Sequence, residues 1–429
     1  MFGFANFLLL ALFAAAVFDL IFALARGSGL RGALHGLWNT PHLLFGQQLA
    51  EWRLQLGSIL FAAGLAAYEI SVVFCNSMAR QNWAWVQGVM SPVLEWLAFL
   101  CFGAKILFGT RYTWRELLAG GALYFIARWV YFNSQNIWWI GIVVAVLAAK
   151  DVPLRRPLQV YFASGCAAMA VVLALHFAGI VAPDLTSERM GALRGTYGYG
   201  HPNTFGGLVF GLVLAYALLR AQKVRWVDCL LVFAVGVFLL VGPASRSAAL
   251  CTLALAVGLV FCRLRAGHSV PRWWPGTCAG MVGLTAAVSY LLPLLVIKVG
   301  PWNNDIGPAW LAKLDSLLTC RISLTWMAYR LLDVKIAGQV FNWPTVDNSF
   351  AFALFQFGPV VAALLGILFA AALWGHAKQG RRVEVCCLFA MLAYAYMEVQ
   401  PFHLTTNPTA LLLCGAVFAQ TSARWQKIE

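Results

Sequence analysis

Long runs of apolar residues, separated by short polar segments, fill the chain from end to end. Each run has about the length, roughly 17 to 25 residues, that an α-helix needs to cross a hydrocarbon core of about 30 Å. The pattern predicts about thirteen membrane-spanning helices, with twelve to fourteen as the range. They lie at about 3–24, 55–75, 91–109, 114–132, 136–149, 159–182, 203–220, 226–242, 246–262, 277–299, 349–374, 384–400 and 405–422.

Composition agrees with this pattern and excludes a soluble globular protein. Hydrophobic residues make up 62% of the 429 residues and charged residues 11%, and the mean hydropathy is +0.77. Because a helix satisfies its own backbone hydrogen bonds, it is the spanning structure that these runs favour. We therefore expect an all-α, polytopic membrane protein that forms a single transmembrane domain over residues 1–429.

The net charge of +14 arises largely from Lys and Arg in short segments between the apolar runs. Such segments are typical of the cytoplasmic side of a membrane protein, so the charge sets topology and no nucleic acid partner is expected. The basic segments are 150–156, 220–225, 263–272, 378–382 and 424–427.

This orientation places two long connections, 183–203 and 300–348, on the outer side of the membrane. Within the second, apolar residues between Trp310 and Leu318 recur at helical spacing. They predict an amphipathic helix along the membrane interface, with Trp302 and Trp310 near the lipid headgroups.

Four helices are expected to begin on the outer side with polar residues. Their starts are His201-Pro202-Asn203-Thr204, Ser245-Arg246-Ser247, Asp347-Asn348-Ser349 and Thr406-Asn407-Pro408-Thr409. Asn, Ser and Asp satisfy free backbone N–H groups at such starts, and Pro fits the first turn, so ordinary capping is one interpretation. The other is a shared polar site, because helix N-termini also favour anions.

Three arginines are candidates for binding such an anion. Arg246 begins a predicted span, where a charge is costly, and we expect it to be buried and to face inward rather than to reach toward the headgroups. Arg321 lies in the outer connection, where an exposed surface charge is the alternative, and Arg194 would be a third. One guanidinium group can donate two parallel hydrogen bonds to phosphate oxygens, and it keeps its positive charge at all ordinary pH values. Arginine therefore suits the binding of a diphosphate.

Asp347 and His201 are the candidate proton acceptors. Five further polar residues could line the same site, with local hydrogen bonding or capping as the alternative. They are Asn203, Asn348, Glu398, His403 and Asn407.

Motifs for phosphate loops, zinc proteases and serine hydrolases are absent from the sequence. Most of the eleven cysteines lie in apolar runs without CxxC spacing. We therefore expect neither a metal site nor a cofactor.

Several short segments, taken together and in this order, resemble the O-antigen polymerase and ligase superfamily. They are Gly198-Tyr199-Gly200-His201-Pro202-Asn203-Thr204-Phe205-Gly206, Ala244-Ser245-Arg246-Ser247-Ala248, Leu318-Thr319-Cys320-Arg321 and Val346-Asp347-Asn348-Ser349-Phe350, followed by Gly358, Glu398 and Asn407-Pro408. The combination is most similar to the Wzy-type polymerases of capsular and exopolysaccharide pathways. It covers the second half of the chain, and the first half matches only as a hydrophobic scaffold.

The resemblance implies a GT-C-like, inverting glycosyltransferase of the bacterial cytoplasmic (inner) membrane, with its active site on the periplasmic face. Its substrate would be an undecaprenyl-diphosphate-linked oligosaccharide, and it would need neither metal nor nucleotide sugar. The resemblance further implies that Arg246 and Arg321 hold the diphosphate and that Asp347 occupies the base position, which is His in the ligases. A chain-length regulator and a flippase would be partners alongside membrane lipids.

Two other functions remain open from the sequence. A ligase of the same superfamily would transfer finished glycan to another acceptor. A transporter or flippase of lipid-linked sugars would need polar residues at the membrane midplane in both halves, whereas the polar motifs here gather at one rim of the second half.

Overall fold

The computed structural model describes residues 2–27, 29–45, 50–181, 187–189, 192–297 and 307–418. The chain divides into two compact units, and α9 (Pro202–Leu219) begins in the first and ends in the second. Unit 1 comprises 1–128, 140–208 and 410–429, and unit 2 comprises 129–139 and 209–409. The two units are described separately, and the single transmembrane domain expected over residues 1–429 stays a prediction.

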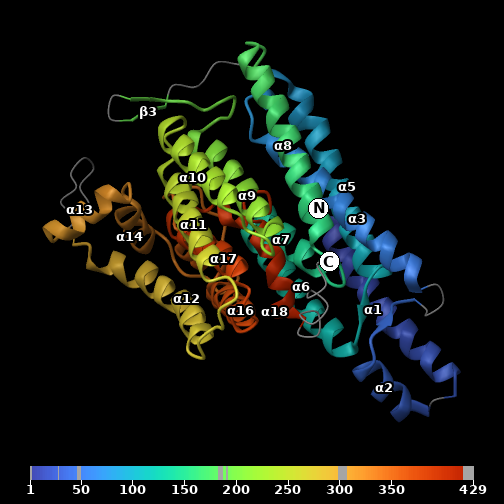
Figure 1. The fold of residues 1–429 in the computed structure, drawn as a ribbon. Coiled ribbons are helices and arrows are strands. Elements are labelled where there is room, and N and C mark those ends of the chain that lie inside the picture. The colour runs from blue at the N-terminus through green and yellow to red at the C-terminus, as the bar shows by residue number, and fades with distance from the viewer. Residues whose placement is uncertain are drawn as a thin grey trace. The chain divides into compact units, whose positions relative to one another are not determined.

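Unit 1 is built mainly from long helices with few charged residues. In order they are α1 (Phe2–Ala25), α2 (Gly29–Asn39), α3 (Ala50–Cys75), α4 (Ala79–Asn82), a π-helical turn (Val86–Met90), α5 (Ser91–Phe108), α6 (Trp114–Ser134), α7 (Ile137–Ala148), α8 (Arg155–Phe177) and, near the C-terminus, a 3-10 segment (Pro408–Leu413) with α18 (Cys414–Val417). Like α9, three of these elements cross the division, since 129–134 of α6, 137–139 of α7 and 408–409 of the 3-10 segment belong to unit 2. Helix α3 packs on both α5 and α8 (Figure 1). Gly57 permits the close approach to the end of α5, since a Cβ there would lie 2.9 Å from the Cα of Gly109.

Two short antiparallel strand pairs also belong to unit 1. Strand β1 (His42–Leu43) pairs with β2 (Arg111–Tyr112), and β3 (Ser187–Arg189) pairs with β4 (Ala192–Arg194). The second pair forms a hairpin within the predicted outer connection 183–203, where no strand was expected.

Unit 2 carries the helices of the second half. They are α10 (Trp226–Val241), α11 (Arg246–Leu264), α12 (Trp274–Leu291) with a 3-10 turn (Leu292–Leu295), α13 (Ala309–Leu317), α14 (Arg321–Leu331), α15 (Ser349–Phe352) with a π-helical turn (Ala353–Phe357), α16 (Pro359–Lys378), α17 (Arg382–Met397) and a 3-10 turn (Gln400–Phe402). Helix α11 packs on α10 and α17, and α12 packs on α16. Figure 1 shows α10 and α11 side by side.

In the described part of the chain, eight helices are long and apolar enough to cross a membrane. They include Asn6–Ala25, whose outward residues Phe7, Leu10 and Phe13 are 63–70% exposed, as expected for a surface that faces lipid. The chain is therefore a largely helical membrane protein, as predicted. The count of thirteen spans and the GT-C-like fold stay predictions.

Two predicted spans differ in the structure. The span expected at 349–374 is interrupted at Gly358, whose φ of +87° is accessible to glycine, and α16 begins at the following proline. The span expected at 405–422 starts as the 3-10 segment and continues only briefly as α18 within the described residues.

The helix predicted at 310–318 is confirmed as α13, one residue earlier. Its two sides differ in burial, because Leu311 is fully buried against Val296 and Ile322 while Trp310 and Leu317 are exposed. That this helix lies along the membrane interface stays a prediction. Trp302 lies outside the described residues.

Candidate functional site

The candidate residues fall into both units. Arg194, His201 and Asn203 belong to unit 1, and the other seven belong to unit 2.

In unit 1, Arg194, His201 and Asn203 form a chain of hydrogen bonds at the start of α9. The Arg194 Nη2 donates to Asn203 Oδ1 at 2.9 Å, and the Asn203 backbone N–H donates to His201 Nδ1 at 3.1 Å. Because Nδ1 accepts this bond, neutral His201 carries its proton on Nε2. The histidine therefore caps α9, and this contact disfavours it as a general base.

The glycine-rich loop before α9 is fixed against other parts of unit 1. The Met78 backbone N–H donates to the Gly198 carbonyl at 2.8 Å, and Ser77 and Tyr199 form an isolated antiparallel bridge. Gly198 has φ of +81°, and a Cβ there would lie 3.0 Å from the Cβ of His176. Gly198 is therefore explained by this turn and this close contact, without a bound anion.

In unit 2, Arg321 and Glu398 form a buried ion pair. Arg321 is 7% exposed and Glu398 5%, and Nη2 of Arg321 lies 2.6 Å from Oε1 of Glu398. The guanidinium also donates to the backbone carbonyls of Leu318, at 2.9 Å, and Met397. Arg321 is thus fully engaged within the protein, which rules out the exposed surface charge that the sequence left open.

Two serines complete the surroundings of this pair. Ser247 in the first turn of α11 donates to Glu398 Oε1 at 2.8 Å and accepts from Arg321 Nη2 at 3.4 Å. Ser349, the first residue of α15, donates to the Glu398 backbone carbonyl at 2.5 Å. Four helix ends, those of α11, α14, α15 and α17, therefore meet at Glu398. We call Ser247, Arg321, Ser349 and Glu398 the Glu398 cluster.

A tight turn between α13 and α14 sets the position of Arg321. Thr319 and Cys320 have φ of 62° and 63°, which reverses the chain just before Arg321. Buried Asp315 of α13 then accepts from the backbone N–H groups of Ile322 and Ser323 at 2.8 and 3.2 Å. Asp315 thus supplies the cap of α14 and holds its first residue in the cluster.

Arg246 begins α11 beside Ser247, yet its side chain is exposed. The prediction that it is buried and faces inward is therefore wrong. Successive residues of a helix point about 100° apart, and the inward position of this turn is taken by Ser247. The side chain of Arg246 makes no hydrogen bond or ion pair with another described residue, so its charge is available to an anion.

Asp347 is half-buried just before α15 and likewise has no hydrogen-bond or ion-pair partner in the described part of the chain. Its neighbour Asn348 is a cap, as the sequence suggested. The Asn348 Oδ1 accepts from the N–H groups of Phe350 and Ala351 at 2.9 and 3.1 Å, and its Nδ2 donates to Ser289 of α12 at 3.2 Å. The fixed neighbour holds Asp347 in place and leaves its carboxylate unpaired.

His403 and Asn407 stabilise the segment that follows Glu398. The Asn407 Nδ2 donates to the Pro401 carbonyl at 2.9 Å. The His403 ring lies on Trp138 with 3.8 Å between ring centres, and desolvation lowers the pKa of His403 to about 3. These contacts fit the alternative of local bonding, and contact with a substrate stays a prediction for both residues.

The sequence did not single out Ser247, Ser349 or Asp315 as site residues. The two serines follow Arg246 and Asn348 at predicted helix starts, which is a usable signal, whereas Asp315 looked like the polar side of an amphipathic helix. In the residues that the structure describes, no group of three or more His, Cys, Asp or Glu side chains could hold a metal ion. No family model, curated protein or solved structure matches the chain.

Proposed function

We propose that the chain is a membrane glycosyltransferase that joins oligosaccharide repeat units linked to undecaprenyl diphosphate. The resemblance noted in the sequence motivates this choice, and the helical membrane architecture agrees with a lipid-linked substrate. The reaction would take place at the outer face of a bacterial cytoplasmic membrane.

One observation carries the proposal: an unpaired cation and an unpaired carboxylate flank the same rigid cluster. Arg246 directly precedes Ser247, and Asp347 lies two residues before Ser349. Both serines bond to Glu398, so the backbone on which each charged residue sits is fixed. An exposed arginine at the end of a membrane helix can also reach the lipid headgroups, so the proposal rests on the position of the two charges beside one cluster and not on an energetic cost.

The residues would share the chemistry as follows. A sugar hydroxyl of one repeat unit attacks the anomeric carbon of another, and the bond from that carbon to the diphosphate oxygen breaks. Arg246 and the N-terminus of α11 stabilise the negative charge that develops on the leaving diphosphate. Asp347 accepts the proton that the attacking hydroxyl loses.

Arg321 takes a revised place in this scheme. Its charge is offset by Glu398, so it contributes less to holding a diphosphate than the sequence suggested. We assign Arg321 mainly a positioning role. It connects the start of α14 to the first turn of α11 through Ser247 and to the last residue of α17 through the Met397 carbonyl.

Deletion of the gene, followed by analysis of lipid-linked glycans, tests the proposal. A polymerase predicts that polymer disappears and that single repeats linked to undecaprenyl diphosphate accumulate on the outer face. Intact lipid-linked polymer with an unmodified acceptor would instead identify a ligase. Single repeats confined to the inner face would identify a transporter.

A further inference from the structure

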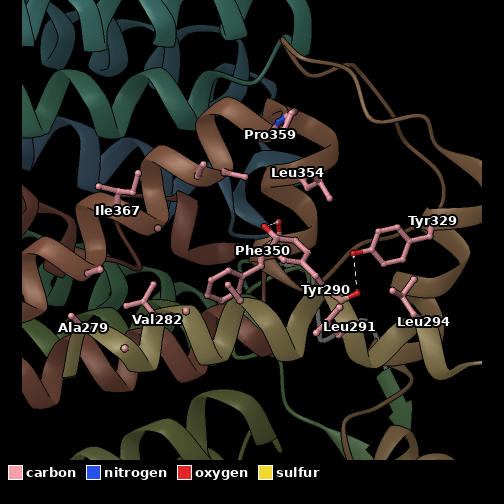
Figure 2. Close-up of a pocket in the computed structure, with 17 residues that line it drawn as sticks. Ala279, Val282, Tyr290, Leu291, Leu294, Tyr329, Phe350, Leu354, Pro359 and Ile367 are labelled. Atoms are coloured by element: carbon pink, nitrogen blue, oxygen red, sulfur yellow. Dashed lines mark hydrogen bonds between the residues drawn. The ribbon is translucent and has the colours of Figure 1, made fainter. Parts of the chain in front are cut away.

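An apolar groove of about 710 Å³ lies in unit 2 between α12 and α16 (Figure 2). Figure 2 shows Tyr290 and Tyr329 at one end of the groove and Ala279 and Ile367 toward the other. No charged side chain lines it among the described residues, and its two tyrosine hydroxyls already donate to backbone carbonyls, of Phe350 at 3.2 Å and of Tyr290 at 3.4 Å. The groove therefore suits a hydrocarbon ligand and offers nothing to a charged headgroup.

Three glycines line the groove inside helices, where glycine is normally unfavourable. They are Gly280, Gly283 and Gly366, and a Cβ at any of them would meet no other atom within 4 Å. Glycine between membrane helices usually serves close backbone packing, and that explanation fails here because the space beside each is empty. These residues keep the groove open without serving protein contacts.

The groove belongs to two helices of unit 2 that each turn most of their surface outward. Only 22% of the apolar window of Trp274–Leu295 is buried inside the protein, and 28% of that of Pro359–Lys378. Both are candidate membrane spans, so the groove between them faces lipid chains.

The tyrosine end of the groove adjoins the Glu398 cluster. Phe350 lines this end and directly follows Ser349, which bonds to Glu398. Ser289, next to Tyr290, accepts the hydrogen bond from Asn348, the residue after Asp347. The wall of the groove and the proposed reaction site are therefore parts of one hydrogen-bonded frame.

We propose that this groove holds the hydrocarbon chain of the lipid diphosphate while the headgroup lies at Arg246. The inference rests on the proposed function, which supplies the headgroup at the adjoining site. Gly283 and Gly366 then act as specificity-determining residues, because a larger side chain at either would occupy the space of the chain.

A photo-crosslinking experiment tests this inference. The probe is a polyprenyl diphosphate with a diazirine near the end of its chain, added to the full-length protein in nanodiscs of phosphatidylethanolamine and phosphatidylglycerol. We expect labelled peptides from α12 and α16, loss of that labelling in Gly366→Leu, and no loss in Gly375→Leu. Gly375 is the matched control, since it lies in the same helix, outside the groove lining, with equally open space at its Cβ.

Two results would overturn the inference. Equal labelling of the two leucine variants would mean that the chain does not enter the groove. Equal labelling of the groove by a phosphatidylglycerol that carries the diazirine near the end of an acyl chain would assign the groove to bulk lipid. Polymer synthesis by the wild-type protein, measured on the same preparation, tests the proposed function independently of the groove. If labelling is intact but no polymer forms, the proposed function is contradicted, while the groove still binds a lipid diphosphate.

Discussion

Arg321 and Glu398 stand 77 residues apart in sequence and form a buried ion pair with 2.6 Å between Nη2 and Oε1. Breaking such a pair by removing one partner leaves an uncompensated charge, which costs about 3–5 kcal/mol. Replacing both partners together removes both charges and avoids that cost. The pair is therefore a sensitive point of the fold, whatever its part in the chemistry.

The first prediction concerns this pair. Arg321→Met should lower the free energy of unfolding by about 3–5 kcal/mol, whereas Arg321→Met combined with Glu398→Leu should recover most of it. Thermal unfolding in detergent would measure both. Additive losses in the double variant would contradict a direct coupling between the two side chains.

Arg246 should behave in the opposite way, because its side chain is exposed and has no partner among the described residues. We expect Arg246→Ala to leave the unfolding temperature unchanged and to slow glycosyl transfer by about 10²- to 10³-fold, as for loss of one group that stabilises developing charge. Arg263→Ala, an exposed arginine at the other end of α11, is the control and should stay active. Equal rates for both variants would remove Arg246 from the site.

Substitutions of the adjacent residues Asp347 and Asn348 should have different effects, the first on turnover and the second on stability. Asp347→Asn keeps the shape and removes the proton acceptor, so turnover should fall by about 10²- to 10⁴-fold without loss of stability. Asn348→Ala removes the cap of α15 and should cost about 1 kcal/mol of stability. Undiminished turnover in Asp347→Asn would leave the reaction without this base.

His403 should make the protein less stable in acid. Its pKa is lowered from 6.5 to about 3 in the folded protein, so the unfolded chain binds a proton first as the pH falls. Stability contributed by the neutral ring is fully present above pH 6.5 and is lost as the pH falls from 6.5 toward 3, by at most about 1.4 kcal/mol per pH unit. His403→Phe keeps a ring against Trp138 and should lose less stability over that range in unfolding measurements. If the stability of His403→Phe fell with pH as steeply as that of the wild type, protonation of His403 would not be the cause of the acid sensitivity.

Much of the helical framework followed from hydrophobic pattern alone, since apolar runs such as 3–24, 91–109 and 246–262 reappear within a few residues of their expected bounds. The break before α16 was missed although Gly358-Pro359 is a known signal, because the apolar residues continue through it. The hydropathy of a segment indicates whether it can lie in lipid, but it does not indicate where the helical backbone is interrupted.

The sequence indicated which residues belong to the candidate site, but it did not indicate how their side chains are oriented or paired. Capping by Asn348 follows from local sequence. Which of Arg246 and Ser247 faces inward depends on the rotation of α11, and hydropathy does not fix a helix rotation at its first turn. The pairing of Arg321 with Glu398 depends on contacts between distant segments, which no local pattern encodes.

The most direct test of the central claim is glycosyl transfer by the purified protein in detergent. Supplied only with repeat units linked to undecaprenyl diphosphate, the wild-type chain should produce a ladder of lipid-linked polymer. Arg246→Ala and Asp347→Asn should form the ladder at least about 10²-fold more slowly, while Arg263→Ala retains the wild-type rate. Absence of any product longer than one repeat from folded wild-type protein, or wild-type ladders from both site variants, would contradict the account.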